Sequence, residues 1–282
     1  MSVADGERRE RVRQIVEQAG SLPTLPEAVL RIAEMVDAPD TTGRQLATQI
    51  SRDQVFSAKV LKLVNSGFYG FSQPIATVRH AVTMLGFNAV KSLLLSVAVL
   101  DRMNQAFPGL WEHSMACART CWIIADHLQI AEPEELSTTG LLHDLGKVVV
   151  YQTLKDAFVR VRLRVEKKGM LVYEAEREVL GADHGEIGTW LLARWALPGG
   201  LTAPIGEHHR FDPGHEHAVR TAAVHLADVL CRAEAFGSGG DWRIPRLDPR
   251  ALETLQASLD DVESIMERMT QELAAIPRLA SG

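Results

Sequence analysis

A histidine directly followed by an aspartate stands in the stretch from Gly140 to Lys147, where a buried helix is expected to end. The imidazole of His143 and the carboxylate of Asp144 together suit a divalent transition metal such as Fe, Mn or Zn. Further candidate ligands are spread along the chain, and they are His113, His184, His208, His209 and Asp228. Because this set exceeds what one ion needs, we expect one or two ions, with Asp144 bridging if there are two.

Each of these histidines, taken alone, has a simpler explanation, because histidines commonly cap helices or bond the backbone inside a helical core. The ordered set is what favours metal binding. Metal binding is still not catalysis, since turnover also requires an open coordination position and a pocket for a phosphate ester.

The order of these residues resembles the signature of the HD-domain metal-dependent phosphohydrolases. That signature is a His, an adjacent His-Asp pair and a later Asp, and it falls on His113, His143, Asp144 and Asp228. The remaining histidines, His184, His208 and His209, are similar to the second-metal ligands of the HD-GYP cyclic-dinucleotide phosphodiesterases. The run from Arg210 to Gly214 contains no Gly-Tyr-Pro, so we expect little or no hydrolysis of cyclic di-GMP.

The same resemblance gives Lys147 a place near the bound phosphate. If the protein is a hydrolase, Asp144 and Lys147 are its expected catalytic residues. A lysine in the last turn of a helix is also favoured by the helix dipole, and both explanations of Lys147 stay open.

The first half of the chain carries a second resemblance. Its motifs are Leu22 to Pro26, the helix from Asp53 to Ser66, and Ile75 followed by Ala81 to Gly86. In this order they are similar to the opening of the HDOD (HD-related output domain) family, a bacterial signalling module often joined to receiver or other regulatory domains. The likeness covers roughly residues 20 to 230. Many members lack the residues that HD enzymes need, whereas this sequence keeps them.

Apolar residues recur every three or four positions along most of the chain, which is the period of a helix, and aromatic residues make up only 6%. We therefore expect an all-α fold. With the resemblance, we expect an HD-domain-like helical bundle that has an N-terminal helical subdomain at 1–105 and an HD-like helical subdomain at 106–235. The sequence pattern adds a linker with an amphipathic helix at 236–282. Thr42 with Gln45 predicts a capping box, and Asp183 with Glu186 predicts another, which places His184 in the first turn of its helix.

The C-terminal part begins with the glycine-rich segment Gly237 to Gly240, which is typical of a flexible linker. Asp248 and Pro249 then start a helix, and its apolar stripe consists of Leu252, Leu255, Leu259, Val262, Met266, Met269 and Leu273. Either the body of the same chain or a second copy must cover this stripe. The flexible linker makes us favour a homodimer.

The three cysteines are an odd number and no export signal precedes them, so we expect no disulfide framework and a cytoplasmic protein. His113, Cys117 and Cys121 share one helix face, which suits either a thiolate zinc site or buried apolar cysteines. We favour the second because no fourth thiolate is near. The longest apolar run, Leu93 to Leu100, is too short to cross a membrane.

The net charge of −6 disfavours direct DNA binding, which requires a basic surface. We expect a regulatory signalling protein that keeps its HD site as a metal-binding or nucleotide-sensing pocket and acts through contacts with other signalling proteins. The alternative is a metal-dependent phosphohydrolase that acts on a nucleotide or cyclic dinucleotide.

Overall fold

The computed structural model describes residues 3–19, 31–32, 34–35, 38, 40–52, 54–65, 74–86, 90, 103, 105–195 and 199–274. Within these ranges all regular structure is helical and no strand occurs, which confirms the all-α expectation. None of these helices combines the length and apolar character that a membrane crossing requires. The motif from Leu22 to Pro26, the residues Asp53 and Ser66, and the run from Leu93 to Leu100 lie outside the described residues.

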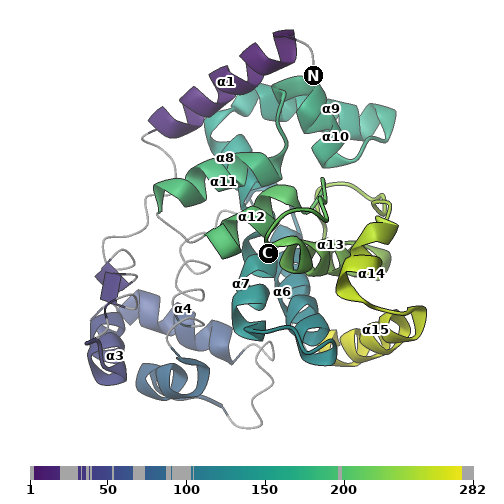
Figure 1. Cartoon of the computed structure of the whole chain (residues 1–282). Coiled ribbons are helices and arrows are strands. Elements are labelled where there is room, and N and C mark those ends of the chain that lie inside the picture. The colour runs from purple at the N-terminus through teal and green to yellow at the C-terminus, as the bar shows by residue number, and fades with distance from the viewer. Residues whose placement is uncertain are drawn as a thin grey trace.

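The helices follow one another in the order shown in Figure 1. They are α1 (Val3–Gln18), α3 (Gly43–Ser51), α4 (Gln54–Val64), α6 (Leu110–His127), α7 (Pro133–Leu142), α8 (Leu145–Thr153), α9 (Lys155–Lys168), α10 (Val172–Leu180), α11 (His184–Arg194), α12 (Gly199–Glu207), α13 (Ala218–Ala233), α14 (Pro249–Leu255) and α15 (Leu259–Leu273). Residues 78–86 form a further helical stretch.

The capping signals in the sequence produce two of these helix starts. Thr42 and Gln45 form both halves of the predicted capping box at the start of α3. Asp183 accepts a hydrogen bond from the backbone N–H of Glu186 at 3.0 Å and so begins α11. The second half of that expected box is missing, because the Glu186 side chain pairs with Arg9 and Arg210 instead.

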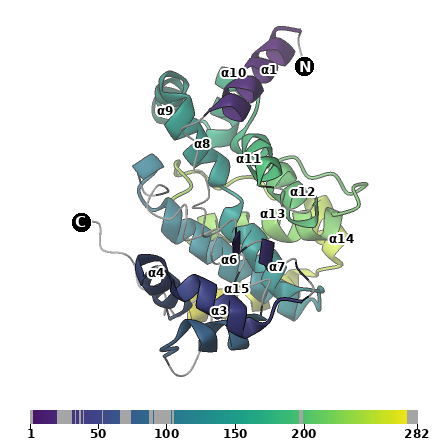
Figure 2. The ribbon, with the colours of Figure 1, turned by 90° about the vertical axis from the view of Figure 1, so that its left-hand side faces the viewer.

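Two ends of the molecule can be distinguished in Figures 1 and 2, where α1, α9 and α10 lie at one end and α3 and α4 at the other. Helices α6, α7, α8, α11, α12 and α13 lie between them. Helix α1 packs on α8, α10 and α11, and the Arg194 side chain donates to the carbonyl of Val16 at 3.2 Å. Although α1 belongs to the expected segment 1–105, it contacts the second half of the chain. The boundaries at 105 and 235 stay predictions.

Side chains of α6 belong to two separate buried apolar clusters. The larger one joins side chains of α1, α3, α4, α8 and α11, and the smaller one joins α6, α13, α14 and α15. The part of the fold that carries the candidate ligands lies between these clusters. Its helices are therefore fixed from both sides by apolar packing.

The expected single C-terminal helix is in fact two helices, α14 and α15. Helix α14 ends at Gln256, which has a φ of 53°. Helix α15 begins after Ser258, whose side chain accepts a hydrogen bond from the backbone N–H of Asp261. Leu255, Met269 and Leu273 of the predicted stripe are buried against α6 and α13, whereas Leu259 is 77% exposed. The inner side of the stripe is thus covered by the same chain.

The segment from Gly237 to Gly240 is packed against the body, which corrects the expectation of a flexible tether. A Cβ atom at Gly237 would lie 2.2 Å from the backbone N of His113, and the φ of Gly237 is 67°. Ser238 donates its backbone N–H to the carbonyl of Gly109 at 2.9 Å. Only glycine allows the backbone to approach the first turn of α6 so closely.

Candidate metal centre

The His-Asp pair lies at the junction between two buried helices. His143 directly follows the end of α7, and Asp144 directly precedes α8. A Cβ atom at Gly146 would lie 1.8 Å from the carbonyl oxygen of His184, so this glycine lets the start of α8 touch the start of α11. The close contact between these two helix starts brings His184 to Asp144.

The structure brings all seven predicted ligand residues together in two sets. In each set, four ligand atoms lie within 4.8 Å of one another. The first set is His113, Cys117, His143 and Asp228, and the second is Asp144, His184, His208 and His209. These side chains, all buried except the partly buried His209, form a cluster that could hold a metal ion.

Asp144 contacts both sets. Its Oδ2 atom lies 3.6 Å from His113 Nε2 and 3.4 Å from His143 Nε2, while its Oδ1 atom lies 3.0 Å from His184 Nε2. Within the first set, His113 Nε2 and Asp228 Oδ1 are 3.1 Å apart. The Asp144 carboxylate therefore stands where a ligand shared by two ions would stand.

Hydrogen bonds orient three of the imidazole rings in the same way. The Nδ1 atoms of His143 and His208 lie 2.7 Å from the carbonyls of Gly140 and Ile205, respectively. The Nδ1 atom of His184 lies 2.6 Å from Glu176 Oε2. A proton on each Nδ1 satisfies these acceptors and turns Nε2 toward the cluster, the arrangement typical of metal-bound histidines.

Several atoms of the cluster lack the hydrogen bonds that burial requires. Among the described residues, His143 Nε2, His208 Nε2 and Asp144 Oδ1 are buried without a hydrogen-bond partner, although His184 lies near the last of these. Each unpaired buried atom costs about 1–3 kcal/mol. A divalent ion would accept these lone pairs, and imidazole with carboxylate suits Fe, Mn or Zn, so the residues fit the expected metal.

The carboxylates of the cluster are held in the charged form. Burial alone would raise the pKa of Asp144, but the neighbouring His143, Lys147 and His184 lower it well below its usual range. Burial also acts to raise the pKa of Asp228, and the hydrogen bond from His113 with the charge of Arg232 lowers it well below that range. Both groups are therefore available as anionic ligands.

The pKa values of two histidines in the second set, His184 and His208, shift in opposite directions. Burial acts to lower the pKa of His184, but the carboxylate of Glu176 and, more weakly, that of Asp144 raise it to about 9. Burial lowers the pKa of His208 to about 3, with help from the nearby His143 and His184. Neutral His208 is ready to bind a metal, whereas His184 must first release a proton.

The comparison with known families decides the classification. The model of the HDOD domain family matches residues 22–211. The chain belongs to the HDOD domain family. This membership confirms the resemblance carried by the spaced motifs of the first half.

Solved structures place this HDOD protein among proteins of the same fold. An HDOD domain protein of unknown function from Geobacter sulfurreducens is 27% identical, with a TM-score of 0.78 over 98% of this chain and 99% of that one. A proposed phosphohydrolase from Shewanella amazonensis SB2B is 21% identical, with a TM-score of 0.70 over 98% and 97%. A proposed signal transduction protein from Marinobacter aquaeolei VT8 is 20% identical, with a TM-score of 0.76 over 96% and 64%.

A curated relative, an uncharacterized protein of Treponema pallidum (strain Nichols), is 26% identical over 226 residues. The match covers 77% of this chain and 44% of that relative. The HDOD chain thus spans less than half the length of the curated relative it matches.

Lys147 lies in the first turn of α8, so the helix-dipole explanation, which needs a lysine in a last turn, is wrong. Its side chain is buried, and its Nζ donates to Asp144 Oδ2 at 2.6 Å. A Cβ atom at Gly239 would lie 3.5 Å from this Nζ, so the glycine segment passes close to the lysine. In this HDOD protein Lys147 positions the carboxylate of Asp144.

The sequence interpretation gave too little weight to Cys117 and missed Glu176. The Sγ atom of Cys117 lies 3.6 Å from His113 Nε2 and joins the first ligand set, whereas Cys121 belongs to neither set. The zinc site that would combine His113 with both cysteines is therefore not formed. The i, i+4 spacing of His113 and Cys117 was the signal in the sequence, while nothing in the sequence marked Glu176.

The cluster reaches the surface through His209. This ring is only partly buried, stacks on Tyr173 with centroids 4.2 Å apart, and has its Nε2 atom 3.0 Å from His184 Nε2. His209 also lines a pocket on the outer side of the cluster. Burial and the nearby His208 lower the pKa of His209 well below its usual value, so the ring is neutral.

Proposed function

We propose that this HDOD protein is a cytoplasmic signalling protein whose metal centre has a regulatory role exerted through contacts with other proteins. Burial of the ligands is the observation that supports this function best. His113, His143 and His208 have 0% of their surface exposed. Asp144, His184 and Asp228 are also buried, and only His209 of the seven is partly exposed. A hydrolase needs an open coordination position that a phosphate ester can reach.

In this proposal His113, His143 and Asp228 hold one ion, and His184, His208 and His209 hold a second, with Asp144 shared. The bound ions supply Lewis acidity and accept the lone pairs that the fold leaves unpaired. Glu176 orients His184, and Lys147 orients Asp144. Cys117 belongs to the first set, and its sulfur favours ions that bind sulfur ligands.

A second candidate function is hydrolysis of a nucleotide or cyclic dinucleotide, with Asp144 and Lys147 as catalytic residues. The complete donor set favours it, together with the pocket that reaches His209. The proposals of a regulatory role and of hydrolysis differ in one measurable respect, which is turnover.

Metal analysis of the purified protein tests the centre itself. We expect one or two transition-metal ions per chain by elemental mass spectrometry. Asp144→Asn keeps the shape of the side chain but removes the shared anion, so it should lose most of the metal. Asp156→Asn, on the exposed face of α9, is the matched control and should keep it. Equal metal in the wild type and in Asp144→Asn would rule the proposed centre out.

A chromatographic assay with cyclic di-GMP and nucleoside phosphates distinguishes the two functions. The regulatory proposal expects no product above a metal-free control. Formation of a linear dinucleotide or of a dephosphorylated nucleoside by the wild type, and its loss in His143→Ala, would establish the hydrolase instead.

A further inference from the structure

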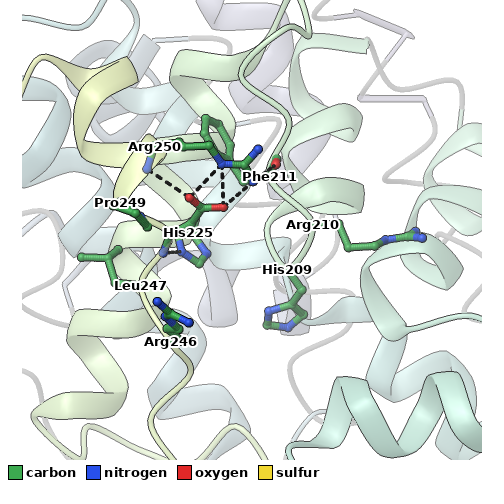
Figure 3. Close-up of a pocket in the computed structure, with 9 residues that line it drawn as sticks. His209, Arg210, Phe211, His225, Arg246, Leu247, Pro249 and Arg250 are labelled. Carbon is green, nitrogen blue, oxygen red and sulfur yellow. Dashed lines mark hydrogen bonds and ion pairs between the residues drawn. The ribbon is translucent and has the colours of Figure 1, made fainter.

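A pocket of about 500 Å³ lies beside the metal centre, between the segment after α12, the side of α13 and the segment that leads into α14 (Figure 3). Its lining residues are His209, Arg210, Phe211, His225, Arg246, Leu247, Asp248, Pro249 and Arg250. Pockets for small molecules and cofactors usually enclose roughly 300–1,000 Å³. This pocket has room for a ligand the size of a nucleotide.

The lining is basic although the whole chain is acidic. Three arginines line the pocket beside a single carboxylate, that of Asp248, while the net charge of the chain is −6. A concave site with this local excess of positive charge attracts an anion.

Most of the polar side chains that line the pocket are already engaged by protein groups. Arg250 pairs with Asp248 at 2.6 Å, and Arg210 pairs with Glu186 at 3.1 Å and points away from the pocket in Figure 3. His225 is also engaged, because its Nδ1 lies 2.7 Å from the His208 carbonyl and its Nε2 accepts the backbone N–H of Asp248 at 3.0 Å.

Arg246 differs from its neighbours. Its side chain is exposed, and the structure gives it no hydrogen bond or ion pair with any described residue. A guanidinium presents paired N–H donors whose geometry matches two phosphate oxygens. An unpaired arginine at the edge of a pocket of this size is suited to bind the anionic group of a ligand.

His209 connects the pocket to the metal centre. It lines the pocket and also belongs to the second ligand set. Tyr173 stacks on the His209 ring and so fixes the position of that ring. On the other side, Leu247 and Pro249 give the pocket an apolar wall that suits a ring or another apolar body.

We infer that this pocket binds an organic phosphate of nucleotide size. The phosphate contacts the guanidinium of Arg246, the apolar body lies on Leu247 and Pro249, and the ligand touches His209 at the edge of the metal centre. This inference deepens the proposed function, since it names the class of ligand that a regulatory metal centre senses. It rests on that function only for the link through His209, because Arg246 needs no metal to bind a phosphate.

Titration calorimetry with adenosine and guanosine monophosphates, and with the same nucleosides lacking phosphate, tests this inference on the full chain. We expect a monophosphate to bind and its nucleoside to bind much more weakly. Arg246→Gln should weaken the binding by about tenfold or more, as expected for a charged hydrogen-bonding partner. Arg160→Gln, on the exposed surface of α9, should leave it unchanged. Equal melting temperatures of the two variants show that both are folded.

Two results would overturn the inference: no monophosphate binds, or Arg246→Gln binds as well as the wild type. Metal content, measured on the same samples, separates the two proposals. Binding that depends on Arg246 in a protein without metal supports the pocket and removes the proposed metal centre. A metal-loaded protein that binds no monophosphate supports the proposed metal centre and removes the pocket as a phosphate site.

Discussion

Glu176 holds His184 at two points. Its Oε2 atom accepts the backbone N–H of His184 at 2.7 Å and lies 2.6 Å from Nδ1 of the same residue. Both side chains are buried, and the second ring nitrogen of His184 lies 3.0 Å from Asp144. One carboxylate from α10 therefore sets the position and the direction of the His184 ring on α11.

Glu176→Gln should weaken metal binding by roughly 10–100-fold, because an outer carboxylate both orients a ligating histidine and raises its basicity. Competition with a chromophoric chelator measures the dissociation constant. Glu178→Gln changes an exposed residue of the same helix and serves as the control. If the two variants bind metal equally well, Glu176 has no role in the centre.

The metal-free protein should be most stable near pH 6.5. The folded pKa of His184 is raised to about 9, so its stabilisation is complete below the ordinary value of 6.5 and is lost as pH rises to about 9. The folded pKa of His208 is lowered to about 3, so the unfolded chain gains a proton first and stability falls as pH drops from 6.5. Each group contributes a slope of up to about 1.4 kcal/mol per pH unit.

Urea unfolding in the presence of a chelator, repeated across this pH range, measures both slopes. His184→Gln should flatten the alkaline side and leave the acid side in place. A wild-type stability that does not change between pH 6.5 and 9 would contradict the assignment of a charged His184.

The candidate ligand residues could be selected from the sequence because their chemical types and their order carry the information, whereas their role as metal ligands stays a prediction. His113, His143, Asp144 and Asp228 are polar residues within largely apolar stretches of the sequence. Their resemblance to the HD-domain signature predicted that they converge within the expected helical fold. The regular spacing of apolar residues predicted that fold, since a period of three or four has one simple solution.

Other features depend on contacts between distant segments, and local sequence does not encode these. Glu176 lies among other glutamates in a helix that the sequence interpretation did not include, and only its packing on His184 gives it a role. A run of glycines is typical of a flexible linker, but close approach of two backbones requires glycine as well, and Gly237 serves that second purpose.

Gly237→Ala should destabilise the protein and lower its metal content. The new methyl group would meet the backbone of His113 at 2.2 Å, so the first turn of α6 has to move and carries a ligand with it. Gly169→Ala is the matched control, since its φ of 63° is similar and nothing lies within 4 Å of its added Cβ. That control should cost only the strain of a left-handed backbone, roughly 1–2 kcal/mol.

Denaturant unfolding and elemental analysis of the two variants check this expectation. A flexible linker at Gly237 would make the two substitutions equivalent in stability and would leave the metal content unchanged in both.

The C-terminal stripe allows a prediction that separates its inner and outer sides. Met269→Ala should lower the free energy of unfolding by roughly 2–5 kcal/mol, because the side chain is fully buried in the cluster with α6 and α13. Leu259→Ala should change it by less than about 0.5 kcal/mol, since Leu259 is 77% exposed. Urea unfolding measures both, and equal losses would show that α15 is not packed as described.

A second pair of variants, Leu259→Asp and Lys155→Asp, tests the homodimer expected from the sequence. Leu259, Val262 and Met266 line a shallow hollow on the outer side of α15, and this is the part of the stripe that remains for a second copy to cover. If pairing uses this surface, light scattering should give a dimer for the wild type and a lower mass for Leu259→Asp. The new carboxylate would be buried in the dimer interface without an opposite charge beside it, which is strongly unfavourable. Lys155→Asp, on the exposed surface of α9, should stay dimeric. A monomeric wild type would remove the homodimer and leave α15 solely as the cover of its own core.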